Sequence, residues 1–125
     1  MIRSVGITAA AFGAAAVLFG AFGAHALRGH LDENALSIWR TSVDYQFWHA
    51  LALLAIAGFA PPNDRRWSSA SGIMIAGPIV FCASLYALAL GAPGWIGVFT
   101  PFGGVMLVTG WVVAGIAFWC SASNK

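Results

Sequence analysis

Charge is what this sequence most lacks. Asp, Glu, Lys and Arg make up 8% of its 125 residues, whereas about 25% is usual for a soluble domain. None of these residues, and no His, occurs between Trp67 and Asn124. Hydrophobic residues reach 60%, which is more than a soluble domain of this size can bury, because its surface is large relative to its volume. The composition therefore excludes a water-soluble domain and predicts a single membrane domain over residues 1–125.

Cysteine and basic residues are also scarce. The two cysteines, Cys82 and Cys120, belong to no paired metal-binding motif such as C-x-x-C. We expect them to lie too far apart for a disulfide, with Cys82 in mid-membrane and Cys120 near the inner end. A net charge of +2 excludes a basic surface for nucleic acid. No catalytic motif is present, so we expect no metal, no other cofactor and no enzymatic activity.

Four mostly apolar segments reach the length of about 20 residues that a transmembrane helix needs. They cover residues 5–27, 42–60, 70–90 and 101–120. Pro61-Pro62 ends the second segment, because proline cannot continue a helix. Thr100-Pro101 predicts the start of the fourth, with Thr100 as N-cap and Pro101 in the first helical position. The predicted fold class is all-α, a polytopic four-helix membrane bundle.

The first segment also has features of a signal peptide. Arg3 precedes it, and an A-x-A-like cleavage pattern ends at Ala26. The uncharged run from Ser4 to Leu27 is longer than the roughly 7–15 residues of a signal-peptide core. We therefore expect this segment to remain as a membrane span.

The cations are distributed unevenly between the two sides of such a bundle. The N-terminus, the second loop and the C-terminus carry four cations, namely Arg3, Arg65, Arg66 and Lys125. The first and third loops carry two cations, Arg28 and Arg40, and two anions, Asp32 and Glu33. Because cytoplasmic loops are enriched in Lys and Arg, both termini are predicted to be cytoplasmic.

The first loop contains a helix signal of its own. Asp32 is predicted to cap a helix that starts at Glu33. Leu36, Trp39, Val43 and Phe47 then share one face at helical spacing. This piece is expected either to lie at the outer surface or to run straight into the second span.

Small residues follow a helical period in three of the segments. In the first, Ala9 and Ala16 accompany the glycines to form one stripe. The glycines predicted to pack against neighbouring helices are Gly6, Gly13, Gly20, Gly23, Gly77 and Gly110. The alternative is that these glycines are scattered, since membrane helices tolerate glycine.

The polar residues of the segments converge on one side of the predicted bundle. They are His25, Asp44, Tyr45, Gln46, His49, Ser84, Tyr86 and Thr100. At 1.5 Å per residue, we expect all of them within roughly 10 Å of the outer interface. Arg40 and Asp44 are four residues apart and are able to pair.

Three interpretations of this polar cluster remain open. The first is a structural network of hydrogen bonds that locks the outer end of the bundle. The second is a binding or conduction site that opens outward, because ionisable groups inside a membrane are a functional hypothesis by default. The third is metal or bis-histidine haem ligation by His25 and His49, although only two strong ligands are present.

Two further features concern the fourth segment. Trp111 lies near mid-membrane, so its indole N–H needs a partner such as a carbonyl or hydroxyl. Gly103-Gly104 predicts a close-packed start of the segment rather than a phosphate loop, because no Lys follows.

Four blocks of sequence carry a family resemblance. They are Phe22-Gly23-Ala24-His25-Ala26-Leu27, Tyr45-Gln46 with His49-Ala50-Leu51-Ala52-Leu53, Ser84-Leu85-Tyr86, and Thr100-Pro101-Phe102-Gly103-Gly104 with Gly110-Trp111. Together they resemble the domain-of-unknown-function 423 family (DUF423), which includes small bacterial inner-membrane proteins and a eukaryotic relative named transmembrane protein 256. Cys82-Ala83 depart from the family pattern of Ser and Gly, and Ala83 would hold a neighbouring helix slightly further away. The resemblance implies four spans and a bacterial inner membrane, and it implies no activity.

These observations favour a small, non-enzymatic integral membrane protein of unknown function. We expect its surroundings to be the lipid bilayer and its role to be that of an accessory, assembly or structural component. It would then act with a membrane-protein partner or as a homo-oligomer. The alternative function is a channel, transporter or small-ligand binder that uses the outward-facing polar cluster.

Overall fold

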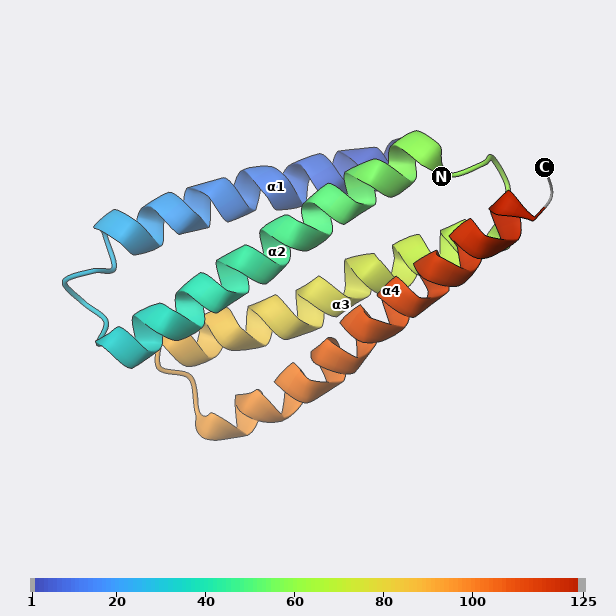
Figure 1. The fold of residues 1–125 in the computed structure, drawn as a ribbon. Helices are drawn as coiled ribbons and strands as arrows, with labels where there is room; N and C mark the ends of the chain where they lie inside the picture. Colours follow the sequence, from blue (N-terminus) through green and yellow to red (C-terminus); the bar gives the residue numbers. More distant parts are fainter. Residues whose placement is uncertain (1, 124–125) are drawn as a thin grey trace.

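The computed structural model describes residues 2–123, and every regular element in this range is helical. The elements are α1 (Ile2–His25), α2 (Glu33–Phe59), α3 (Arg65–Ala89), the short 3-10 helix η1 (Gly94–Val98) and α4 (Phe99–Ala122). The four long helices run side by side, which confirms the predicted all-α, four-helix architecture (Figure 1). The start of α1 and the end of α4 lie at one end, which we call the terminal end. The loops that follow α1 and α3 lie at the other, the loop end, whereas Lys125 lies outside the described residues.

The helices pack in chain order and do not close into a ring. α1 packs against α2, α2 against α3, and α3 against α4. Within residues 2–123, α1 and α4 make no comparable contact. α2 and α3 therefore form the centre of the molecule. Toward the terminal end, a core cluster joins all four helices through Val5, Ala9, Leu53, Ile56, Ala60, Trp67, Met74 and Ala117.

α2 is longer than the second predicted segment. The helix begins at Glu33 and not at residue 42, and the side chain of Asp32 caps it by accepting a 2.7 Å hydrogen bond from the Ala35 N–H. The amphipathic piece of the first loop therefore runs straight into the second segment, as one of the two alternatives predicted. With 27 residues, α2 is about 40 Å long at 1.5 Å per residue.

Three helical stretches are long and apolar enough to cross a membrane. They are Ile2–His25, Arg65–Ala89 and Gly94–Ala122, whereas the sequence predicted four spans. α2 is not among them, because Glu33, Arg40 and Asp44 and several uncharged polar residues lower its apolar character. α2 nevertheless packs against both α1 and α3, so it is an integral part of the helix assembly.

The stripe of small residues on α1 faces α2. A Cβ atom added at Gly6 would lie 3.7 Å from the Ala57 Cβ, which is ordinary contact. A Cβ added at Gly23 would lie 2.5 Å from the Trp39 Cδ1, closer than two carbon atoms approach. The two helices therefore need glycine mainly at Gly23, near the loop end.

α3 and α4 approach each other more closely than α1 and α2. A Cβ added at Gly103 would lie 2.5 Å from the Phe81 backbone N, and one added at Gly110 would lie 2.7 Å from the Met74 Cγ. The backbone of α4 thus rests directly on α3 at Gly103, where a sequence of small residues at the helix start predicted close packing.

The start of α4 differs from the prediction. The helix begins at Phe99, directly after η1, and Val98 at the N-cap position makes no side-chain capping bond. Thr100 already lies in the first turn, so its predicted role as N-cap is wrong. The physical reason is that η1 leads into α4 and the Thr100 hydroxyl bonds to α3 instead.

Candidate functional site

The buried face of α2 organises the candidate site. Its residues recur at alternating steps of three and four, and they are Trp39, Ser42, Gln46, His49, Leu53, Ile56 and the C-cap residue Ala60. The first four, nearer the loop end, carry hydrogen-bonding side chains, and we call them the polar half. Leu53, Ile56 and Ala60, nearer the terminal end, form the apolar half.

Trp39 and Ser42 tie the polar half to two different helices. The Trp39 indole Nε1–H donates a 2.8 Å hydrogen bond to the Phe19 carbonyl of α1. The Ser42 hydroxyl donates to the Cys82 carbonyl of α3 at 2.9 Å. The Cys82 thiol in turn donates to the Ser42 carbonyl at 3.4 Å, so the two residues bond reciprocally.

Gln46 joins three helices. Its side-chain Nε2 donates to the Phe12 carbonyl of α1 at 2.9 Å. Its Oε1 accepts a 2.8 Å hydrogen bond from the Tyr86 hydroxyl of α3. The Tyr86 ring also packs against Trp39, with ring centroids 4.6 Å apart, so the phenol is held from both sides.

His49 connects α2 to α4. The Trp111 indole Nε1–H donates to the His49 Nε2 at 3.1 Å, and the His49 Nδ1 lies 2.6 Å from the Tyr45 carbonyl. An indole N–H only donates, so Nε2 must be the unprotonated nitrogen, and Nδ1–H then donates to the carbonyl. The arrangement therefore holds His49 as one neutral tautomer with both ring nitrogens engaged.

Ser84 and Thr100 form a separate bridge between α3 and α4. The Ser84 hydroxyl donates to the Phe81 carbonyl at 2.8 Å and lies 2.7 Å from the Thr100 hydroxyl. Since Ser84 uses its one proton on the carbonyl, Thr100 is the donor of the second bond. This bridge closes the loop end of the α3–α4 pair.

The polar network is internally satisfied. Within residues 2–123, every buried side-chain nitrogen and oxygen atom of a residue that is not itself exposed has a hydrogen-bond partner. A buried polar group without a partner would cost free energy, and here neighbouring helices supply the partners.

The structure does not bring the whole predicted cluster together. Gln46 bonds to Tyr86, Ser84 to Thr100, and Tyr45 contributes its carbonyl to His49. His25 and Asp44 are exposed and take no part in this network. The predicted Arg40–Asp44 pair is wrong, since the one ion pair among the described residues joins Arg66 to Asp64 at 3.4 Å.

Neighbouring residues show where His49 lies along the helix assembly. Gly13 of α1 faces Ala50, the residue after His49, so His49 is level with the middle of α1. Its partner Trp111 lies at the middle of α4. His49 is therefore near the middle of the helix assembly and not near the loop end, while its depth below the outer interface stays a prediction.

The two histidines are far apart. His25 lies in the last turn of α1, beside Gly23, which faces Trp39. His49 follows Trp39 by ten residues, or about 15 Å along the helix axis. The structure therefore does not form the bis-histidine site, and the described residues hold no group of three or more His, Cys, Asp or Glu placed to bind a metal.

Sequence reasoning missed several members of the network. Ser42 and Cys82 bond between helices, and so does Trp39, which was predicted to share a face with Val43 and Phe47 but not to form such a bond. Phe47 is in fact 38% exposed. The steps 39, 42, 46 and 49 were a signal that could have found the face, because in lipid the polar side chains turn inward. Trp111 was expected to need a partner, and that partner is an imidazole and not a carbonyl or hydroxyl.

An open groove lies between α2 and α4, whose backbones stay further apart than those of helices adjacent in the chain. Its volume is about 630 Å³. Aromatic rings of Tyr45, Trp48, Phe81 and Trp111 line it, together with His49. His49 and Trp111 of the network are thus accessible from the side of the helix assembly, through this groove.

Long apolar helices joined by buried polar contacts define a bacterial multi-pass membrane protein of the small helical class. The chain belongs to the DUF423 family, described as proteins of unknown function, which it matches over residues 19–104. The resemblance predicted from the sequence blocks is confirmed. The matched range begins at Phe19, whose carbonyl accepts the hydrogen bond from Trp39. It ends at Gly104, the residue after the close contact of Gly103 with α3.

Bacterial relatives share most of the chain's length. A UPF0382 membrane protein of Staphylococcus aureus is 40% identical over 102 residues, which is 82% of this chain and 84% of the relative. A UPF0382 membrane protein of Staphylococcus epidermidis is also 40% identical, with the same coverage of 82% and 84%. The UPF0382 membrane protein YwdK of Bacillus subtilis is 38% identical, covering 82% of this chain and 85% of the relative. No solved structure matches the chain.

Proposed function

We propose that this protein is a non-enzymatic structural or accessory component of the bacterial inner membrane. The observation that carries the proposal is the internally satisfied network on the polar half of α2. Catalytic and transport sites present polar groups to a substrate. The polar groups of Gln46 and His49 are instead hydrogen-bonded to α1, α3 and α4. These contacts support a rigid four-helix unit that associates with a larger membrane complex or with further copies of itself.

We further propose that all four long helices cross the membrane, with both termini in the cytoplasm. The polar half of α2 faces other helices, so the outward surface of α2 is apolar, although the mean hydropathy of the whole helix is low. Trp48, Leu51 and Leu54 are 54%, 50% and 45% exposed on that surface. The cation distribution supports the orientation, because Arg3, Arg65 and Arg66 lie at the terminal end.

Cysteine labelling tests this topology. Gly29→Cys places a thiol in the loop after α1, where a Cβ has open space around it, and Pro62→Cys places one in the loop after α2. In a Cys120→Ala background, the remaining Cys82 is buried. A membrane-impermeant maleimide should label Gly29→Cys in intact spheroplasts and Pro62→Cys only after lysis. Labelling of both from outside would overturn the four-span arrangement.

The outer face of α4 supports association with another helix. Phe102, Val105, Val108 and Val112 are 56–66% exposed, and α3 is the one long helix whose backbone closely approaches α4 among residues 2–123. Native mass spectrometry of the protein in mild detergent tests the proposal. A defined hetero-complex or a homo-oligomer is the expected result. A monomer that transports or converts a small molecule in proteoliposomes would overturn it.

A second function is a channel, transporter or small-ligand binder, and the aromatic groove between α2 and α4 favours the binder. Val105 lines this groove and is 66% exposed. Val105→Trp would fill the groove without touching the His49–Trp111 bond. A binder predicts that this variant loses a ligand found in native mass spectra while it keeps the wild-type helix content. Unchanged ligand occupancy would exclude the groove as the site.

A further inference from the structure

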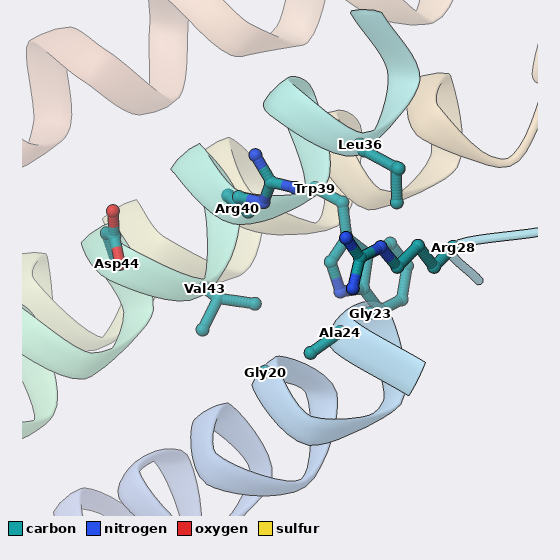
Figure 2. Close-up of a pocket in the computed structure, with 9 residues that line it drawn as sticks. All are labelled: Gly20, Gly23, Ala24, Arg28, Leu36, Trp39, Arg40, Val43 and Asp44. Atoms are coloured by element: carbon teal, nitrogen blue, oxygen red, sulfur yellow. The ribbon is translucent and has the colours of Figure 1, made fainter. Parts of the chain in front are cut away.

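A second pocket lies at the loop end, between the last turns of α1 and the first turns of α2 (Figure 2). Its volume is about 460 Å³, within the range of roughly 300–1,000 Å³ that small-molecule sites occupy. The only member of the polar half in its lining is Trp39. The pocket is therefore distinct from the groove between α2 and α4.

Small residues create this pocket. Gly20 and Gly23 present no side chain to it, and Ala24 presents only a methyl group. The Trp39 ring lies against Gly23 and is anchored by its hydrogen bond to the Phe19 carbonyl. The wall is thus pre-formed, so a ligand does not have to pay for ordering it.

Two unpaired guanidinium groups line the pocket. Arg28 comes from the loop after α1 and Arg40 from the second turn of α2. Figure 2 shows them near Trp39, with Asp44 set apart further along α2. Among residues 2–123, no hydrogen bond or ion pair engages the side chain of Arg28, Arg40 or Asp44. The pocket therefore carries two positive charges and one negative charge.

The pocket extends inward along α1 from the loop that follows it. Arg28 lies beyond the end of α1, whereas Gly20 lies five residues before that end, or about 8 Å further in. Gly20, Ala24 and Val43 line the lower part. Asp44, the neighbour of Val43, also lines this depth. Two guanidinium groups above a lower part that is apolar except for this one exposed carboxylate match the polarity of a phospholipid.

From this arrangement we infer that the pocket binds one anionic phospholipid, with the phosphate at Arg28 and Arg40 and the glycerol and first acyl carbons along Gly20, Ala24 and Val43. The fork of a guanidinium group fits phosphate oxygens in a bidentate way. A zwitterionic headgroup would bring an ammonium group toward the two guanidiniums, which disfavours it. The inference goes beyond the proposed function and requires only that the loop end lies at a membrane surface.

Lipid titration of the purified, delipidated protein tests this inference. Native mass spectrometry would follow the binding of phosphatidylglycerol and of phosphatidylethanolamine with identical acyl chains. We expect a saturable first phosphatidylglycerol, bound at least about fivefold more tightly than phosphatidylethanolamine, as about one charge contact predicts. Equal affinity for the two lipids would overturn the inference, and this comparison needs no variant to fold.

Variants locate the site. Arg28→Gln should weaken phosphatidylglycerol binding about fivefold, whereas Arg65→Gln removes the same charge at the terminal end and should leave it unchanged. Asp44→Asn removes the carboxylate from the pocket and should strengthen binding. An equal loss in Arg28→Gln and Arg65→Gln would show non-specific attraction and overturn the site.

Filling the pocket tests whether binding needs the cavity itself and not only the charges around it. Ala24→Leu fills the lower part while keeping every charge, and Ala14→Leu adds the same bulk at an exposed position of α1 outside the pocket. We expect only Ala24→Leu to reduce phosphatidylglycerol binding. Inorganic phosphate or glycerol 3-phosphate at equal concentration should not displace the lipid. Displacement by either would identify a soluble anion as the ligand and overturn the lipid assignment. The oligomer or hetero-complex of the proposed function is read in separate spectra, so the two proposals fail independently.

Discussion

The two halves of the α2 buried face solve the same problem in different ways. The polar half joins α1, α3 and α4 through directed hydrogen bonds from Trp39, Ser42, Gln46 and His49. The apolar half holds the same helices through the contacts of Leu53, Ile56 and Ala60. In lipid there is no hydrophobic drive to associate, so apolar contacts stabilise through close packing, whereas hydrogen bonds also select one partner atom and one register. The apolar half of α2 therefore contributes close packing, whereas the polar half fixes which helices are its neighbours and in which register.

The largest expected effect lies in the apolar half. Leu53 has no exposed surface, and Leu53→Ala leaves a cavity among α1, α2 and α3. We expect it to lower the free energy of unfolding by about 2–3 kcal/mol, the lower part of the usual range, because lipid removes part of the transfer term. Equilibrium unfolding in mixed detergent micelles measures this. The adjacent Leu54, 45% exposed, supplies the control Leu54→Ala, which should cost under about 0.5 kcal/mol.

Glycine contacts sharpen the comparison from the side of α1. Gly23 faces Trp39 of the polar half with no room for a Cβ, whereas Gly6 faces Ala57 with ordinary room. We expect Gly23→Ala to lower the free energy of unfolding by about 2 kcal/mol through overpacking. Gly6→Ala should change it by less than about 0.5 kcal/mol. Equal effects in the two variants, measured by the same unfolding assay, would contradict the view that the α1–α2 contact needs glycine mainly at Gly23.

Removing the two hydrogen bonds of Gln46, which join α2 to α1 and α3, tests whether the polar half stabilises the folded protein. Gln46→Leu keeps a side chain of similar size but loses the bonds to Phe12 and Tyr86. We expect a loss of about 1–2 kcal/mol, because each interhelical hydrogen bond in a membrane protein contributes about 0.6 kcal/mol and the Tyr86 hydroxyl loses its partner. Phe47→Leu, at the neighbouring exposed position, is the control. A Gln46→Leu protein as stable as the wild type would refute a stabilising role.

The smallest expected effect is the coupling between His49 and Trp111. A double-mutant cycle with His49→Phe and Trp111→Phe should give an interaction energy of about 0.6 kcal/mol. Trp48 lines the same groove but makes no hydrogen bond to His49, so a cycle with Trp48→Phe should give a value near zero. Similar energies in both cycles would mean that ring packing, and not the hydrogen bond, couples α2 to α4.

The elements were more predictable than the contacts of the site. Apolar runs and the Asp32 cap indicated where helices lie, because backbone groups in lipid must bond within a helix. Predicted helix ends failed at α4, where η1 precedes Phe99 and Thr100 bonds to Ser84. The predicted face of α2 is confirmed for Leu36 and Trp39, which are buried, and wrong for Phe47, which is 38% exposed. Directly beyond Trp39 the inward side is polar, so an apolar periodicity could not follow it.

The sequence by itself determined the class of protein, the helices and the glycine stripe of α1. Its shortage of charge demands a bilayer, and these properties depend on composition and local spacing. Only the tertiary structure decided that His25 and Asp44 stay outside the network while Trp39, Ser42 and Cys82 enter it. The physical reason is that a hydrogen bond depends on which helices are neighbours and on their register, and one-dimensional spacing carries neither. The packing of α1 against α2 also formed the pocket beside Arg28.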